Sequence, residues 1–139
     1  MKSSNDIKTL LYRFVKDSDL YTKVLSMGGK LYKTDRIPNS TTNDCCVLVN
    51  TTLMGQFELA TAFIHVYVQD KKRNTEDYVE DTILTGEIEN IIKTSLFKDR
   101  KEIVIEPYKI TLVSLDIFKV NERNEHCVNA QLSLRIFNY

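Results

Sequence analysis

The chain has 139 residues, of which 42% are hydrophobic and 27% charged, a mixture typical of a globular domain and unlike that of disordered or fibrous chains. Nineteen basic residues balance nineteen acidic ones, so no net field draws the protein to nucleic acid or to an anionic membrane. No run of 18 apolar residues occurs, and no apolar region follows the N-terminal residues 1–6, so we expect neither secretion nor a membrane span. Residues 1–139 should form a single domain. The three cysteines are odd in number, and Cys45 and Cys46 are adjacent, so we expect neither a disulfide framework nor a CxxC metal site, which fits a reducing place of synthesis.

The N-terminal part of the chain predicts one amphipathic helix over residues 4–27. Its apolar side chains recur at the spacing of one helix face, at Ile7, Leu10, Leu11, Phe14, Tyr21, Val24 and Leu25. Two glycines at 28–29 follow directly, and glycine tolerates the left-handed conformation that ends helices, so the helix should end near Met27. Residues 30–33 then predict a short strand, and the polar stretch 36–44 predicts a loop.

Two strands should follow, over 45–53 and 57–68, with a hairpin turn at 54–56. Alternate residues of the longer strand separate onto two faces. One face carries Ala60, Ala62, Ile64, Val66 and Val68, and the other carries Phe57, Leu59, Phe63 and Tyr67. Because both rows are apolar, both faces of this strand need cover.

A charged loop is expected over 70–75, followed by a second helix over 76–96, which has the clearest helical spacing in the chain. Its acidic residues gather in the first turns and its basic residues at the far end, which matches the sign of the helix dipole; these are Glu76, Asp77, Glu80 and Asp81, then Lys93 and Lys98. We interpret the acidic residues of this segment as a solvated helix face and not as a catalytic pair.

Residues 107–120 and 126–137 predict an antiparallel hairpin joined by the polar turn 121–125. The last strand alternates, with Val128, Ala130, Leu132, Leu134 and Ile136 facing inward and Asn129, Gln131, Ser133 and Arg135 facing outward. The element order therefore predicts an α+β fold: an antiparallel β-sheet of two hairpins plus a short strand, with two α-helices packed on one face.

Residues with catalytic or metal-binding potential are scattered. His65 is the first suspect for an enzyme with an unfamiliar site, but no nucleotide-binding, nucleophile-elbow or zinc-protease motif occurs, so we expect no enzyme and no cofactor. A metal site built from His126, Cys127 and the Cys45–Cys46 pair would require distant strands to converge, and adjacent strand residues point to opposite faces. We therefore expect no metal.

Two short basic clusters, at 71–73 and 98–101, bracket the second predicted helix. They are either solvated loops at the two helix ends or, if both project into one channel, contacts for phosphate. The second reading gives an alternative function, a small nucleic-acid-binding module of ferredoxin-like shape. Such modules expose strand aromatics beside a glycine-rich consensus, and Phe63, Tyr67 and Phe137 lack that context.

One stretch resembles a known family. The sequence Arg36-Ile37-Pro38-Asn39-Ser40, continuing to Asp44, precedes strands that end in Ile64-His65-Val66-Tyr67-Val68-Gln69-Asp70. This arrangement is similar to the tail-completion (tail-terminator) and neck, or head-tail connector, proteins of tailed phages, particularly those of Bacteroides-like hosts, where an R-P-x-N-S loop precedes strands ending in V-x-V-Y-V-x-D.

The resemblance implies a structural virion protein without an active site, made in the cytoplasm of the host bacterium. It implies a homo-oligomeric ring, six-fold in a tail terminator or twelve-fold in a connector, that contacts portal or adaptor proteins and tail proteins and lines the passage of the genomic DNA. A ring interface needs complementary patches on two sides of the subunit. The predicted interface residues lie in three loops and are Arg36, Pro38, Asn39, Ser40, Asp44, Asp70, Lys71, Lys72, Arg73, Asn121 and Arg123.

Overall fold

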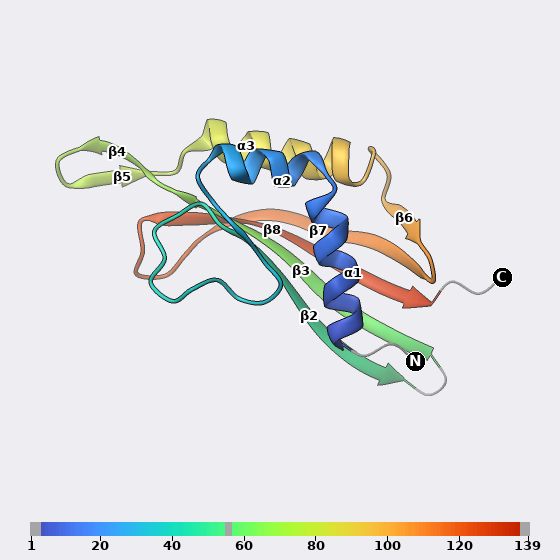
Figure 1. Cartoon of the computed structure of the whole chain (residues 1–139). Helices are drawn as coiled ribbons and strands as arrows, with labels where there is room; N and C mark the ends of the chain where they lie inside the picture. Colours follow the sequence, from blue (N-terminus) through green and yellow to red (C-terminus); the bar gives the residue numbers. More distant parts are fainter. Residues whose placement is uncertain (1–3, 55–56, 137–139) are drawn as a thin grey trace.

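The computed structural model describes residues 4–54 and 57–136, which form an α+β fold built on a six-stranded mixed sheet (Figure 1). The strand order is β1-β2-β3-β8-β7-β6, and β4 and β5 form a separate two-stranded sheet. The elements are α1 (Ser4–Lys16), α2 (Asp19–Ser26), β1 (Leu31–Tyr32), β2 (Cys45–Met54), β3 (Phe57–Gln69), β4 (Lys71–Asn74), β5 (Asp77–Val79), α3 (Thr82–Ile91), η1 (Ile92–Leu96, π-helical), β6 (Glu102–Ile105), β7 (Tyr108–Lys119) and β8 (Glu125–Ile136). The expected turn at 54–56 falls partly outside the described residues.

The expected N-terminal helix is two helices, because Ser18 caps a second one. The Ser18 hydroxyl donates to the Val15 carbonyl at 2.6 Å, and its oxygen accepts the backbone N–H of Leu20 at 3.2 Å. This bonding closes α1 and opens α2, as serine at an N-cap does. The predicted end was correct, since α2 finishes at Ser26 and Gly28 has a φ of +78°.

The two predicted hairpins are present, because β2 pairs with β3 and β7 pairs with β8, both antiparallel. β3 and β8 join the two hairpins into one sheet, also antiparallel, with Ile64 directly opposite Ala130, a pairing that the sequence did not predict. The sheet is nevertheless mixed and not purely antiparallel, because β1 runs parallel to β2. Strand β6, which pairs with Tyr108–Thr111 of β7, was not anticipated at all.

The core lies between one face of the sheet and the helices. The row from Ala60 to Val68 is buried there, as predicted, together with Val128, Ala130, Leu132 and Leu134 of β8. Ile136, predicted to face inward, is 37% exposed at the strand end. The opposite face of the sheet has no helix in the described structure. Only the loop 33–44 crosses one end of it, so the expectation that both faces are covered was right for that end alone (Figure 1).

The expected long second helix begins six residues later than predicted. Residues 71–79, taken from the sequence as a loop and the first helical turn, form the β4–β5 hairpin, which projects from the body (Figure 1). The Asp81 side chain accepts the backbone N–H of Leu84 at 3.1 Å and so fixes the start of α3. Glu76 and Asp77 therefore do not lie in the helix, and Asp81 serves as its cap.

Candidate assembly interface

The three loops predicted to form an interface meet at one end of the sheet. The backbone N–H of Asp70 donates to the Asn124 carbonyl at 2.9 Å, and the Arg123 guanidinium donates to the Ser40 carbonyl. Loop 33–44, the β7–β8 turn and the root of the β4–β5 hairpin are thus joined directly, although they are far apart in sequence (Figure 1).

A buried ion pair lies beneath this junction. Glu125 has an exposure of 0%, and its carboxylate accepts hydrogen bonds from the Arg36 guanidinium, one of them at 2.9 Å, and from the Gln69 amide at 2.6 Å. Arg123 adds a second cation at 3.2 Å. Burial alone would raise the pKa of Glu125, but the hydrogen bonds from Arg36 and Gln69 outweigh it and hold the pKa below its usual range.

Arg36 also covers the helix-free face of the sheet. The central carbon of its guanidinium lies 3.5 Å from the centroid of the Tyr67 ring, within the range of a cation–π contact. The Arg36 side chain is only 9% exposed. Arg36 thus fastens the loop 33–44 onto β3 and β8 and is not available to a partner.

Asp44 holds the other end of the same loop. Its buried carboxylate accepts the backbone N–H of Lys30 at 2.9 Å and the hydroxyls of Ser40 and Thr42 at 2.8 and 2.7 Å. A carboxylate with three donors is well satisfied inside a protein. The predicted interface residues Arg36, Ser40, Asp44 and Arg123 therefore build the junction itself.

The root of the β4–β5 hairpin is anchored through His126. Its ring nitrogen Nδ1 lies 2.7 Å from Asp70, which precedes β4, and Nε2 lies 3.7 Å from Glu80, which follows β5. One side chain of β8 thus contacts both chain segments at the base of the hairpin. Asp70, another predicted interface residue, belongs to this anchor, with a side chain 2% exposed.

The remaining predicted residues are exposed around the junction. They are Pro38, Asn39, Asn121, Lys71, Lys72 and Arg73, and the last three lie on β4, whose four residues are all exposed. We call residues 71–79 the arm. Its strands pair with each other, and the Arg73 guanidinium forms an ion pair with Asp77 across the hairpin.

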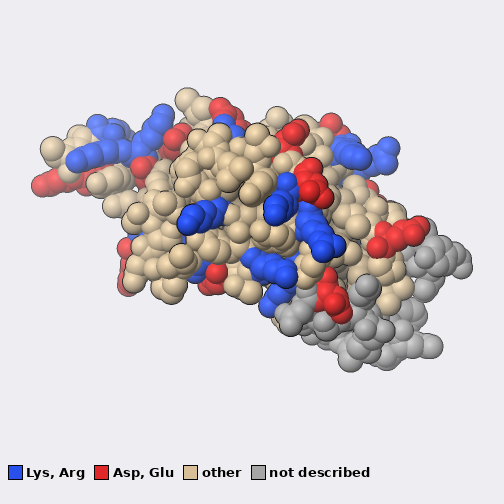
Figure 2. Space-filling model, viewed as in Figure 1, with Lys and Arg blue, Asp and Glu red and all other residues tan. Residues whose placement is uncertain are grey.

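The two basic clusters do not come together. The arm precedes α3, whereas residues 98–101 follow η1, so the intervening helical segment 82–96 separates them by about 20 Å. Figure 2 shows basic side chains on the arm and another group over the far end of α3, with acidic residues interspersed. One subunit therefore does not present both clusters to a single channel.

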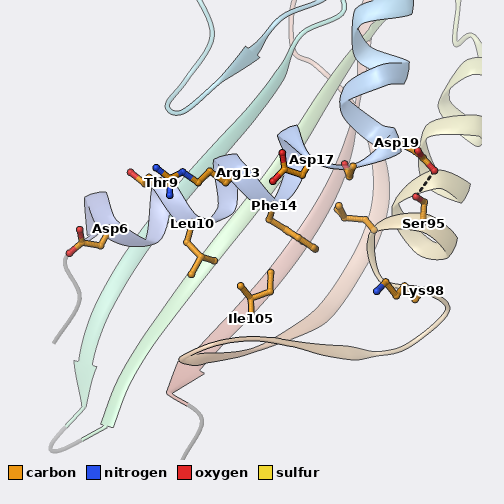
Figure 3. A pocket seen from close by; sticks show the side chains of 12 residues that line it. Asp6, Thr9, Leu10, Arg13, Phe14, Asp17, Asp19, Ser95, Lys98 and Ile105 are labelled. Carbon is orange, nitrogen blue, oxygen red and sulfur yellow. Dashed lines mark hydrogen bonds between the residues drawn. The ribbon is translucent and has the colours of Figure 1, made fainter.

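A cleft opens at the end of the molecule opposite the arm, and its cavity volume is about 710 Å³. It lies between α1, the α1–α2 junction, η1 and β6 (Figure 3). Its lining combines an apolar floor with a charged rim and comprises Asp6, Thr9, Leu10, Arg13, Phe14, Asp17, Ser18, Asp19, Ser95, Leu96, Lys98 and Ile105. The Ser95 hydroxyl donates to Asp19 at 2.9 Å across the cleft.

The residues considered for catalysis or metal binding are His65, His126 and the three cysteines. The His65 ring centroid lies about 6 Å from those of Phe63, Tyr67 and Phe118, and burial lowers the pKa of His65. Cys45 faces the core, while Cys46 and Cys127 lie on the opposite face, and all three thiols are buried. Within residues 4–54 and 57–136, no group of three or more metal-ligating side chains comes together.

Sequence reasoning missed Glu125 and the cleft. Glu125 was counted as part of a polar turn, because its main partner Arg36 lies 89 residues away and leaves no local signal. The cleft joins residues of α1 to Ile105 on a strand that the sequence did not predict.

No protein-family model matches this chain, and no curated protein matches its sequence. In the described part of the chain, none of the helices is long and apolar enough to cross a membrane.

Proposed function

We propose that this protein is a structural subunit that assembles into a closed ring in the neck or tail of a tailed phage and acts there without catalysis. In this role the ring joins portal or adaptor proteins to tail proteins, and the genomic DNA passes through its centre. The proposal is motivated by the resemblance over residues 36–70 to tail-completion and neck proteins.

The observation that best supports assembly is the arm. An isolated two-stranded hairpin is marginally stable in water, because it has little apolar surface to bury. This one extends from the body with every residue of β4 exposed. A hairpin that projects in this way gains cover when it contacts another subunit, and so favours an assembling protein over a solitary domain.

The outer edge of strand β2 also favours assembly. β1 pairs with β2 only at Cys45 and Cys46, so in the described structure the outer edge of β2 from Val47 onward has no strand beside it. Residues 47–54 hold no charge and no proline, the features with which monomeric proteins usually protect an edge. An unprotected edge is expected where another chain covers it.

A nucleic-acid-binding module is supported less well, because the two basic clusters lie at opposite ends of the subunit. The test is to mix the purified protein with the portal complex of its own phage and image the products by negative stain. We expect rings seated on the portal. A protein that ignores the portal but binds DNA at low salt would overturn the proposal and favour the alternative.

A further inference from the structure

We infer that the arm of one copy docks into the cleft of the next copy, an inference that rests on the proposed ring assembly and specifies its interface. The arm and the cleft lie at opposite ends of the subunit, on either side of α3 and η1 (Figures 1 and 3). An arm therefore does not reach the cleft of its own chain. Contact between two unlike patches of identical subunits runs head to tail and can close into a ring.

The arm presents an aromatic side chain next to a cation. Tyr78 is 41% exposed, and in the register of the hairpin it lies directly opposite Lys72. Cross-strand partners project from the same face of a hairpin, so a partner meets the Tyr78 ring and the Lys72 ammonium together. Aromatic residues with a polar end are common anchors of protein interfaces.

The cleft offers the complementary surface. Leu10, Phe14 and Ile105 form an apolar floor, and carboxylates such as Asp17 stand at the rim beside Arg13 and Lys98 (Figure 3). Leu96 also belongs to the apolar lining. A cavity of about 150 Å³ is enough to hold benzene, so a cleft of about 710 Å³ admits a tyrosine ring with its neighbours. We place Tyr78 on this floor and Lys72 beside Asp17 at the rim.

The net charges of the arm and the cleft are opposite in sign. The arm carries three basic and two acidic residues, and the cleft carries three acidic and two basic residues. Arg73 already pairs with Asp77, and the Lys71 ammonium lies 3.9 Å from the carboxylate of Asp81, so we assign the positive charge that a partner meets to Lys72. The arm therefore has a net charge of +1 and the cleft of −1, which favours contact between arm and cleft over arm against arm or cleft against cleft.

Disulfide trapping tests this contact. Lys72→Cys in one copy and Asp17→Cys in a differently tagged copy should form a mixed disulfide dimer when the two are combined and oxidised. The native Cys45, Cys46 and Cys127 are buried and do not compete. The matched control combines Lys72→Cys with Asn90→Cys. Asn90 lies on the exposed surface of α3, so this pair should give at least tenfold less of the mixed disulfide dimer.

Exchanging the charges of Lys72 and Asp17, two exposed side chains, gives a second test. Lys72→Asp should weaken self-association at least tenfold, and Lys72→Asp combined with Asp17→Lys should restore it. If the wild type forms rings but neither the mixed disulfide nor the charge rescue appears, the arm–cleft contact is wrong and ring assembly stands. If the wild type forms no oligomer, alone or on the portal, both proposals fail.

Discussion

Replacing Arg36 by methionine tests whether the buried pair with Glu125 holds the junction together. The change removes the guanidinium but keeps an apolar side chain on the Tyr67 ring. Breaking a buried pair costs about 3 to 5 kcal/mol, because the remaining charge is left without its partner. Since Gln69 and Arg123 still contact Glu125, we expect the lower end, about 3 kcal/mol.

Urea unfolding measures this loss of free energy. With a slope of about 2 kcal/mol per molar urea, the midpoint should fall by about 1.5 M. The matched control is Arg73→Met, which breaks the exposed pair with Asp77 on the arm, where the arginine side chain is 64% exposed. Exposed pairs contribute about 0 to 1 kcal/mol, so the control should barely move the midpoint.

The double variant Arg36→Met with Glu125→Leu separates pairing from packing. It removes the carboxylate at position 125 together with its main partner, and Arg123, whose side chain is 26% exposed, can turn to water, so most of the lost stability should return. If Arg36→Met costs no more than Arg73→Met, or if the double variant is no more stable than the single one, the pair does not hold the junction together.

Acid should weaken the wild type through the same pair. The folded pKa of Glu125 lies below its unfolded value of about 4.3, so the contribution is fully present above that pH and is lost as the pH falls through the folded value. In Arg36→Met the effect of burial gains weight and moves the pKa of Glu125 toward or above its unfolded value, so the loss of stability in acid through this group should shrink or reverse. Unfolding at a series of pH values between about 3 and 7 measures this difference; parallel profiles would contradict it.

Three further predictions concern other parts of the fold. Gly29→Ala should prevent stable folding, because the added Cβ would overlap the carbonyl of Asn43. Gly86→Ala, in open space on α3, should instead stabilise the protein by about 0.5 to 1 kcal/mol and raise its thermal midpoint. Equal thermal midpoints for the two variants would refute this prediction. Asp44→Ala should cost about 1 to 3 kcal/mol in urea unfolding, because three donors lose their acceptor, and a neutral result would contradict the loop geometry. Burial raises the pKa of every thiol, to about 12 for Cys46, so an alkylating reagent at pH 8 should modify none of the thiols in the folded protein and all of them in urea; rapid labelling of the native state would count against the burial of Cys45, Cys46 and Cys127.

The long strands could be predicted from sequence because their signals are local. Alternation along residues 60–68 and 128–134 identifies the buried face directly, and the structure confirms it. The end of the N-terminal helical region was also a local signal, because Gly28 adopts the left-handed conformation that commonly ends helices. The break at Ser18 was missed, because apolar spacing continues across it and conceals a capping serine.

The arm and the junction depend on information that no short window contains. The acidic residues Glu76 and Asp77 suit the start of a helix, yet they lie in a hairpin whose root is fixed by His126, more than 40 residues away. In the same way, Arg36 appears in the sequence as an exposed loop residue, and only the fold brings it to Glu125. The exposed residues of the predicted interface, such as Lys72, needed no distant partner and were placed correctly on the surface.

The measurement that tests ring assembly most directly is the mass of the purified protein by light scattering over a wide concentration series, with and without the portal complex. For a closed ring we expect a species of fixed stoichiometry, six or twelve subunits, that does not grow further as the concentration rises, because a ring that closes has no free ends. A monomer of 16.1 kDa at every concentration, unchanged by the portal, would contradict it.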